Sequence, residues 1–142
     1  MPRPYASGIV PGDVDEVWRR VRDFNGLPTW HPGIAASEIE PGHGAFEIGA
    51  VRTLTLADGG VVREQLLAFD DPGRSYTYNI LDSPFPVRRY ISTIRVAPIT
   101  ATGDTFVEWW TEYDADAADE ENLDKTFAKG VFATGIKALA GG

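Results

Sequence analysis

The residues of this chain best suited to acid–base chemistry are one histidine and two glutamates. His31 stands in the corner sequence Trp30-His31-Pro32, and Glu64 and Glu108 fall in stretches that read as strands. A histidine titrates near neutral pH, and a carboxyl group buried among apolar side chains can serve as an acid or a base. These three are the candidate catalytic residues. His31 alone leaves three alternatives open: a corner residue outside any site, a ligand contact, or a proton-transfer group.

Other kinds of reactive site find little support in the sequence. There are no cysteines, so the chain has no thiolate nucleophile, thiolate metal ligand or disulfide. His31, Glu64 and Glu108 are residue types that can ligate zinc, but no close ligand spacing supports such a site, and we expect neither a metal nor another cofactor. No Ser-His-Asp order stands out, and the Ala-Asp-Gly-Gly segment at residues 57–60 is too short for a phosphate-binding loop.

Length and composition indicate one globular domain over residues 1–142. The apolar fraction of 43% is enough for a core, and the net charge is −8. The thirteen Lys and Arg are scattered, so a basic face for nucleic acid is not expected. No apolar run is long enough to span a membrane, and we expect a cytoplasmic protein. Assembly as a homodimer stays open.

The elements expected to position these residues are helical at both ends of the chain and extended in between. Val14, Val17, Trp18 and Val21 recur at helical spacing, and we expect two short helices near the N-terminus. Residues 34–113 read as strands joined by short turns, which favours an antiparallel meander.

The last predicted element is a long helix over residues 116–139. Its apolar stripe is formed by Leu123, Phe127, Val131, Ile136 and Leu139. Two glycines, Gly130 and Gly135, are costly in a helix, and either tight packing against the sheet or space left for a ligand explains them. The predicted fold class is α+β, with a curved antiparallel sheet wrapped around this helix and a cavity between them.

Strand alternation places several polar residues on the apolar faces of the predicted strands. Tyr90 and Ser92 share a face, and Tyr78 lies on the apolar face of its own strand. Glu64 shares a face with Leu66. These side chains are therefore expected to point toward the helix.

In the last predicted strand, alternation does not decide which face is buried. Glu108 and Trp110 lie on one face, and Trp109 and Tyr113 lie on the other. A buried Glu108 beside Glu64 would need hydrogen-bond partners, because an unpaired buried carboxylate is costly. Candidate partners are His31, Arg52, Tyr78, Tyr90 and Ser92.

Three stretches carry a resemblance to a known superfamily: VPGDVDEVWRRVRDFNGLPTWHPGI, DGGVVREQLLAFDDPGRSYTYNI and FVEWWTEYDAD. The chain resembles the START-like superfamily, also called SRPBCC, whose helix-grip fold is shared by Bet v 1, polyketide cyclases and lipid-transfer domains. It is most similar to bacterial polyketide cyclase/dehydrase and lipid transport proteins, and more distantly to plant abscisic-acid receptors. The short ADGG segment and the PFPVRRY stretch depart from the gate and latch of those receptors.

The resemblance implies a binding cavity and assigns residues to it. A lysine that meets the ligand's carboxylate stands in the receptors where this chain has His31. The resemblance alone places Glu108 inside the cavity. The candidate ligand-binding residues are Trp30, His31, Arg52, Leu54, Glu64, Tyr78, Tyr90, Ser92, Glu108, Trp110, Phe127 and Val131.

The function expected from these features is binding of a small apolar or amphipathic molecule, as a carrier or binding protein. The alternative is an enzyme of the polyketide cyclase/dehydrase type, in which pocket Glu, His or Tyr groups give acid–base help. A stress-related or chaperone-like module of the same fold is a third alternative.

Overall fold

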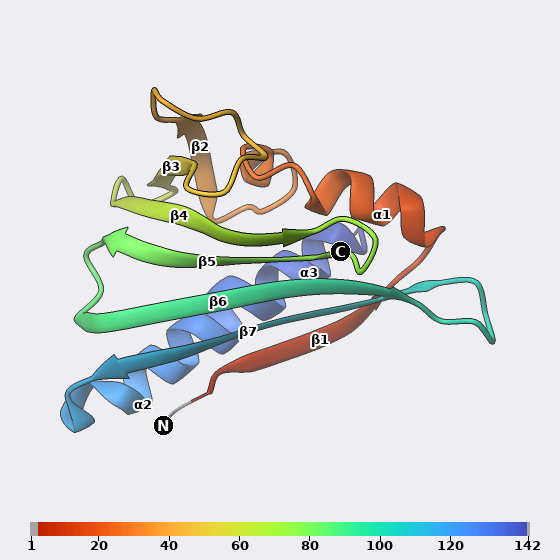
Figure 1. Cartoon of the computed structure of the whole chain (residues 1–142). Helices are drawn as coiled ribbons and strands as arrows, with labels where there is room; N and C mark the ends of the chain where they lie inside the picture. Colours follow the sequence, from red (N-terminus) through yellow and green to blue (C-terminus); the bar gives the residue numbers. More distant parts are fainter. Residues whose placement is uncertain (1–2, 142) are drawn as a thin grey trace.

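A seven-stranded antiparallel sheet that curves around a long C-terminal helix dominates the computed structural model, which describes residues 3–141 (Figure 1). The strand order is β1-β7-β6-β5-β4-β3-β2. The α+β class and the antiparallel sheet are confirmed. The strands are β1 (Tyr5–Val10), β2 (Ile34–Ile39), β3 (Val51–Leu56), β4 (Val61–Asp70), β5 (Ser75–Asp82), β6 (Val87–Pro98) and β7 (Thr105–Ala115).

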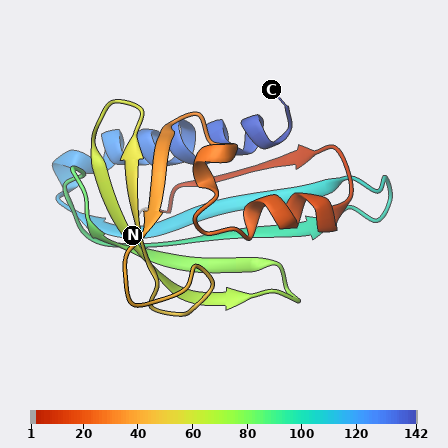
Figure 2. The ribbon, with the colours of Figure 1, turned by 90° about the horizontal axis from the view of Figure 1, so that it is seen from above.

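Short turns make β2 to β7 a meander in which neighbours in sequence are neighbours in the sheet. Between β3 and β4 the turn contains Gly59 with φ +93°, a left-handed conformation that glycine adopts without strain. Strand β1 departs from the meander and pairs with β7 at the other edge. Figure 2 shows β2 and β3 turned steeply across the direction of β6 and β7, so that the sheet curls over the helix.

One helix and one short turn precede β2. Helix α1 (Val14–Val21) begins after Asp13, whose carboxylate accepts a hydrogen bond from the Asp15 amide at 3.1 Å. The second expected helix is only a three-residue 3₁₀ turn, Leu27–Thr29. A longer helix is blocked because Pro32 biases His31 toward extended geometry. The prediction of two short helices is therefore correct for one of them.

The C-terminal helix runs without a break over three segments. These are α2 (Ala117–Lys125), a π-helical segment η2 (Thr126–Ala133) and α3 (Thr134–Leu139). The apolar residues facing the sheet include Leu123, Phe127, Phe132, Ile136 and Leu139, which are buried. The predicted long helix is confirmed, and its π-helical middle was not predicted. Within residues 3–141 no helix is both long and apolar enough to cross a membrane.

The two glycines of this helix have different surroundings. A Cβ on Gly135 would lie 2.6 Å from the His31 ring and 2.9 Å from the Trp109 ring, so tight packing explains Gly135. A Cβ on Gly130 would meet no atom within 4 Å. Gly130 therefore borders open space, which lies beside the cavity described next.

Candidate functional site

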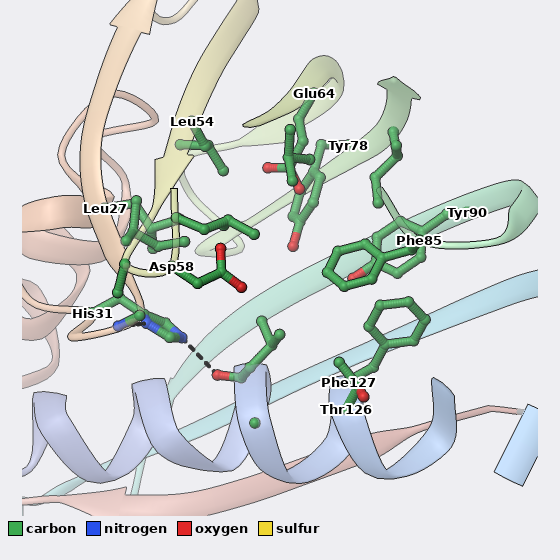
Figure 3. A pocket seen from close by; sticks show the side chains of 18 of the residues that line it. Leu27, His31, Leu54, Asp58, Glu64, Tyr78, Phe85, Tyr90, Thr126 and Phe127 are labelled. Atoms are coloured by element: carbon green, nitrogen blue, oxygen red, sulfur yellow. Dashed lines mark hydrogen bonds between the residues drawn. The ribbon is translucent and has the colours of Figure 1, made fainter. Parts of the chain in front are cut away.

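A cavity of about 320 Å³ lies between the inner face of the sheet and the C-terminal helix (Figure 3). Strands β3 to β7 form one wall, and η2 forms the other. The mouth lies among exposed residues of both walls, Ala57 and Asp58 on the β3–β4 turn and Gly130 on the helix. Most of the lining is apolar, including Leu27, Ile34, Leu54, Val62, Ile80 and Phe85.

The structure brings seven of the candidate residues together around this one cavity. They come from segments far apart in the sequence: the corner before β2, strands β3 to β6, and the helix. The seven are His31, Leu54, Glu64, Tyr78, Tyr90, Phe127 and Val131.

Glu108 and Trp110 lie on the outer face of the sheet, and their placement in the cavity was wrong. Glu108 pairs with Arg95 at 3.5 Å, and Trp110 stacks on Tyr5 with 6.4 Å between ring centroids. The error has a simple cause, because burial alternates along β7 and puts the other face of that strand inward. Trp109 lines the cavity instead.

Three further candidates are buried but lie outside the lining. The Ser92 hydroxyl donates to the Trp110 carbonyl oxygen at 2.8 Å. Trp30 is 6% exposed and packs against Trp109, with 5.8 Å between ring centroids. Arg52 is fully buried beside the wall. Trp30 and Arg52 contact the lining residues Trp109 and Glu64 from the side away from the cavity.

Arg52 forms a buried ion pair with Glu64 at the polar end of the cavity. Its Nε and Nη2 lie 2.9 Å and 2.7 Å from the same Glu64 oxygen, Oε1. Its Nη1 donates to the Phe24 carbonyl oxygen at 2.7 Å. The guanidinium lies 4.0 Å from the centroid of the Phe24 ring and 4.9 Å from that of Tyr78. The aromatic faces and the charge of Glu64 stabilise the guanidinium away from water, although Nη2 forms no hydrogen bond of good geometry with residues 3–141.

The second carboxylate oxygen of Glu64, Oε2, has no hydrogen-bond partner among residues 3–141. Glu64 is 6% exposed, and it lines the cavity, so this oxygen meets the interior space. Burial raises the pKa of Glu64, and the Arg52 charge opposes that rise. Glu64 thus offers the cavity one strong acceptor.

Tyr78 offers the cavity a donor. Its oxygen accepts a hydrogen bond from Trp109 Nε1 at 3.1 Å, and its hydroxyl points into the cavity (Figure 3). Burial raises the pKa of Tyr78 and of Tyr90, so both phenols keep their hydrogen at ordinary pH. The rings of Tyr90 and Phe127 pack edge to face, 4.9 Å apart, and close this end of the wall.

Both ring nitrogens of His31 are occupied by the protein itself. Nδ1 accepts from the Gly33 amide at 3.0 Å, which leaves Nε2 to donate to the Val131 carbonyl oxygen at 2.7 Å, the dashed line in Figure 3. This arrangement is that of a neutral ring with its hydrogen on Nε2. His31 was a candidate partner for Glu64 and Glu108, but neither ring nitrogen contacts either carboxylate directly. His31 connects the corner to the helix through the Val131 carbonyl oxygen, and it also lines the cavity.

Protonation of His31 is expected to destabilise the fold, because Nδ1 would then lose the Gly33 amide as a donor. Burial lowers the pKa of His31 from its ordinary value of 6.5. Just below pH 6.5, His31 is therefore protonated in the unfolded chain and still neutral in the folded chain. The contribution of His31 is therefore complete above pH 6.5 and is lost as pH falls through the lower folded pKa.

The measurement is urea unfolding between pH 8 and pH 5 for the parent and for His31→Gln, which cannot titrate. The parent should lose more stability than the variant over this range. Equal losses in the two proteins would contradict the prediction, and comparing them removes the contributions of the carboxyl groups.

Trp109 is the main lining residue that sequence reasoning missed. Its face of β7 carries Val107 and Tyr113, whereas the opposite face carries the two carboxylates Glu108 and Glu112. A rule that keeps charges outside would have chosen the correct face. Within residues 3–141, no three His, Asp or Glu side chains lie close enough to hold a metal ion.

A curved antiparallel sheet that grips a C-terminal helix, with an apolar cavity between them, defines a helix-grip domain. The family model described as polyketide cyclase / dehydrase and lipid transport matches residues 2–141, and the chain belongs to that family. The predicted resemblance is confirmed.

Solved structures of bacterial proteins share the fold over 99% of this chain. The protein XoxI from Bacillus cereus is 35% identical, with a TM-score of 0.89 and 94% of its chain covered. An uncharacterized protein from Bacillus thuringiensis is 34% identical, with a TM-score of 0.87 and 97% covered. A protein from Thermobifida fusca is 28% identical, with a TM-score of 0.89 and 91% covered. No curated protein matches the chain.

Proposed function

We propose that this protein binds a small apolar or amphipathic organic molecule in the cavity between the sheet and the C-terminal helix. The observation that carries the proposal is the cavity itself, about 320 Å³ of space with a mostly apolar wall. This volume lies in the range of small-molecule sites, which combine apolar walls with a few placed polar groups. Leu54, Tyr78, Phe127 and Val131 would supply apolar contact, and Glu64 would fix the ligand's orientation.

Blocking the cavity from the helix should weaken binding strongly without harming the fold. Gly130 borders the cavity, and a side chain added there meets no atom at its Cβ. Gly130→Leu should therefore fold at least as stably as the parent, because glycine is unfavourable in a helix. Because Gly130 lines the cavity at its exposed edge, an isobutyl group there would narrow the cavity or its mouth. Binding is measured by the fluorescence of the uncharged probe N-phenyl-1-naphthylamine, and the variant should lose at least tenfold in affinity.

The matched control is Ala133→Leu, which adds a similar side chain at an exposed position of the same π-helical segment. The control should bind the probe as the parent does. Unchanged binding by Gly130→Leu, with both variants folded, would contradict the proposed location of the site. Native mass spectrometry of protein purified from its own host would identify a bound molecule.

The uncommitted Glu64 oxygen favours a second candidate function, an enzyme of the cyclase/dehydrase type. A carboxylate with a raised pKa beside the Tyr78 phenol is a pair that could move a proton on a bound substrate. His31 is less suited to this role, because both of its nitrogens are engaged. A molecule that co-purifies and is unchanged on incubation supports the carrier, and its conversion to a product supports the enzyme.

A further inference from the structure

The cavity presents negative and neutral polar groups but no cation. The negative groups are the carboxylates of Glu64, whose Oε2 has no partner among residues 3–141, and of Asp58 at the mouth. The neutral polar group is the Tyr78 hydroxyl, whose oxygen already accepts a hydrogen bond from Trp109. Among the described residues that line the cavity, none is a lysine or an arginine.

The nearby positive charge of Arg52 is not available to a ligand. Its Nε and Nη2 face Glu64 Oε1, and its Nη1 is bound to the Phe24 carbonyl oxygen. Arg52 is 0% exposed and lies outside the lining. His31 is also unavailable, since Nε2 donates to the Val131 carbonyl oxygen and Nδ1 accepts from an amide. A bound anion would therefore find no cationic hydrogen-bond donor in the lining, and the positive charge of Arg52 is already paired with Glu64.

We propose that the cavity selects uncharged ligands that carry a hydroxyl group, alcohols or phenols, over carboxylates of the same size. A ligand hydroxyl can donate to Glu64 Oε2, and a ligand oxygen can accept from the Tyr78 hydroxyl. A carboxylate can only accept, and it places a second negative charge beside Glu64 in a site of low polarity. The inference rests on the proposed function and names the ligand class for the same cavity.

The test uses the unmodified protein and three aromatic probes of nearly equal size at pH 7.5: 2-naphthol, 2-naphthoate and naphthalene. Each is titrated against bound N-phenyl-1-naphthylamine, an uncharged reporter. We expect 2-naphthol to displace the reporter at a concentration about tenfold lower than 2-naphthoate, since hydrogen bonds to a charged group are among the stronger ones. Naphthalene, without a polar group, should be weaker than 2-naphthol.

Tyr78→Phe tests the donor separately. It should weaken 2-naphthol several-fold and leave naphthalene unchanged, and naphthalene binding also shows that the cavity is intact. Tyr76→Phe is the control for loss of a buried hydroxyl outside the cavity, because Tyr76 is equally buried on the same strand and neighbours Arg52 but does not line the cavity. The control should keep the parent's preference.

The outcomes separate the two proposals. Reporter binding with 2-naphthoate equal to or tighter than 2-naphthol overturns the selection for hydroxyl ligands and leaves the proposed function standing. An equal loss of naphthalene and 2-naphthol in Tyr78→Phe overturns the role of the donor. Failure of the reporter and of all three probes to bind overturns the proposed function and the inference together.

Discussion

Glu64→Ala is expected to lower the free energy of unfolding by about 3–5 kcal/mol, the cost of leaving one member of a buried ion pair alone. The Arg52 guanidinium would remain fully buried beside the Phe24 carbonyl oxygen and the rings of Phe24 and Tyr78, with no opposite charge paired to it. Urea unfolding monitored by circular dichroism measures the loss.

The matched control is Glu108→Ala, on the outer face of the sheet. Glu108 pairs with Arg95 at 3.5 Å, and the Arg95 side chain is 47% exposed, so water screens this pair. Its removal should cost less than about 1 kcal/mol. A double variant, Arg52→Met with Glu64→Leu, should recover much of the loss, because apolar groups can replace a buried pair. Similar small costs for both single Glu variants would contradict this account.

Trp30→Ala is expected to cost about 3–5 kcal/mol, as for other large buried aromatic side chains. Trp30 is 6% exposed and packs on the rings of His31 and Trp109. Its Nε1 has no hydrogen-bond partner among residues 3–141, so the loss comes from packing alone. Thermal and urea unfolding both report it.

Trp110→Ala provides the comparison for the same residue type on the opposite face of the sheet. Trp110 is half-buried, stacks on Tyr5 and lies under the Arg3 guanidinium. Removing it should cost about 1 kcal/mol. If the two tryptophan variants lost equal stability, Trp30 would not be the core residue that the structure shows.

Much of the fold could be predicted because local signals and the overall pattern agree. The Asp58-Gly59-Gly60 turn and the apolar spacing before it fix the β3–β4 hairpin from neighbouring residues alone. The 3₁₀ turn at Leu27–Thr29 was harder, since Pro28 permits a helix start while Pro32 prevents its continuation. The π-helical segment leaves no local signal, because its wide turns depend on contacts with the sheet.

The site was predictable where one strand face is clearly more apolar than the other. Tyr78 and Tyr90 followed from alternation, and Glu64 followed with them. The prediction that Glu108 lines the cavity was wrong because it followed the family resemblance alone. The cost of burying a second carboxylate favours the outer face, where Glu108 lies. The engaged nitrogens of His31 could not be foreseen, since their partner Val131 is 100 residues away in the sequence.

We expect the pairing of β1 with β7 to limit the order in which the sheet can form. Tyr5 lies opposite Trp110, whereas every strand from β2 to β6 finds its next neighbour close by in the sequence. During synthesis on the ribosome, the strands from β2 to β6 can pair with their neighbours as they emerge. The backbone groups of β1 have no strand partner until β7 has been made. Contacts that join distant parts of a chain form slowly. The cavity has its second wall on the C-terminal helix, so it cannot be complete until residues 126–131 have been made and packed against the sheet.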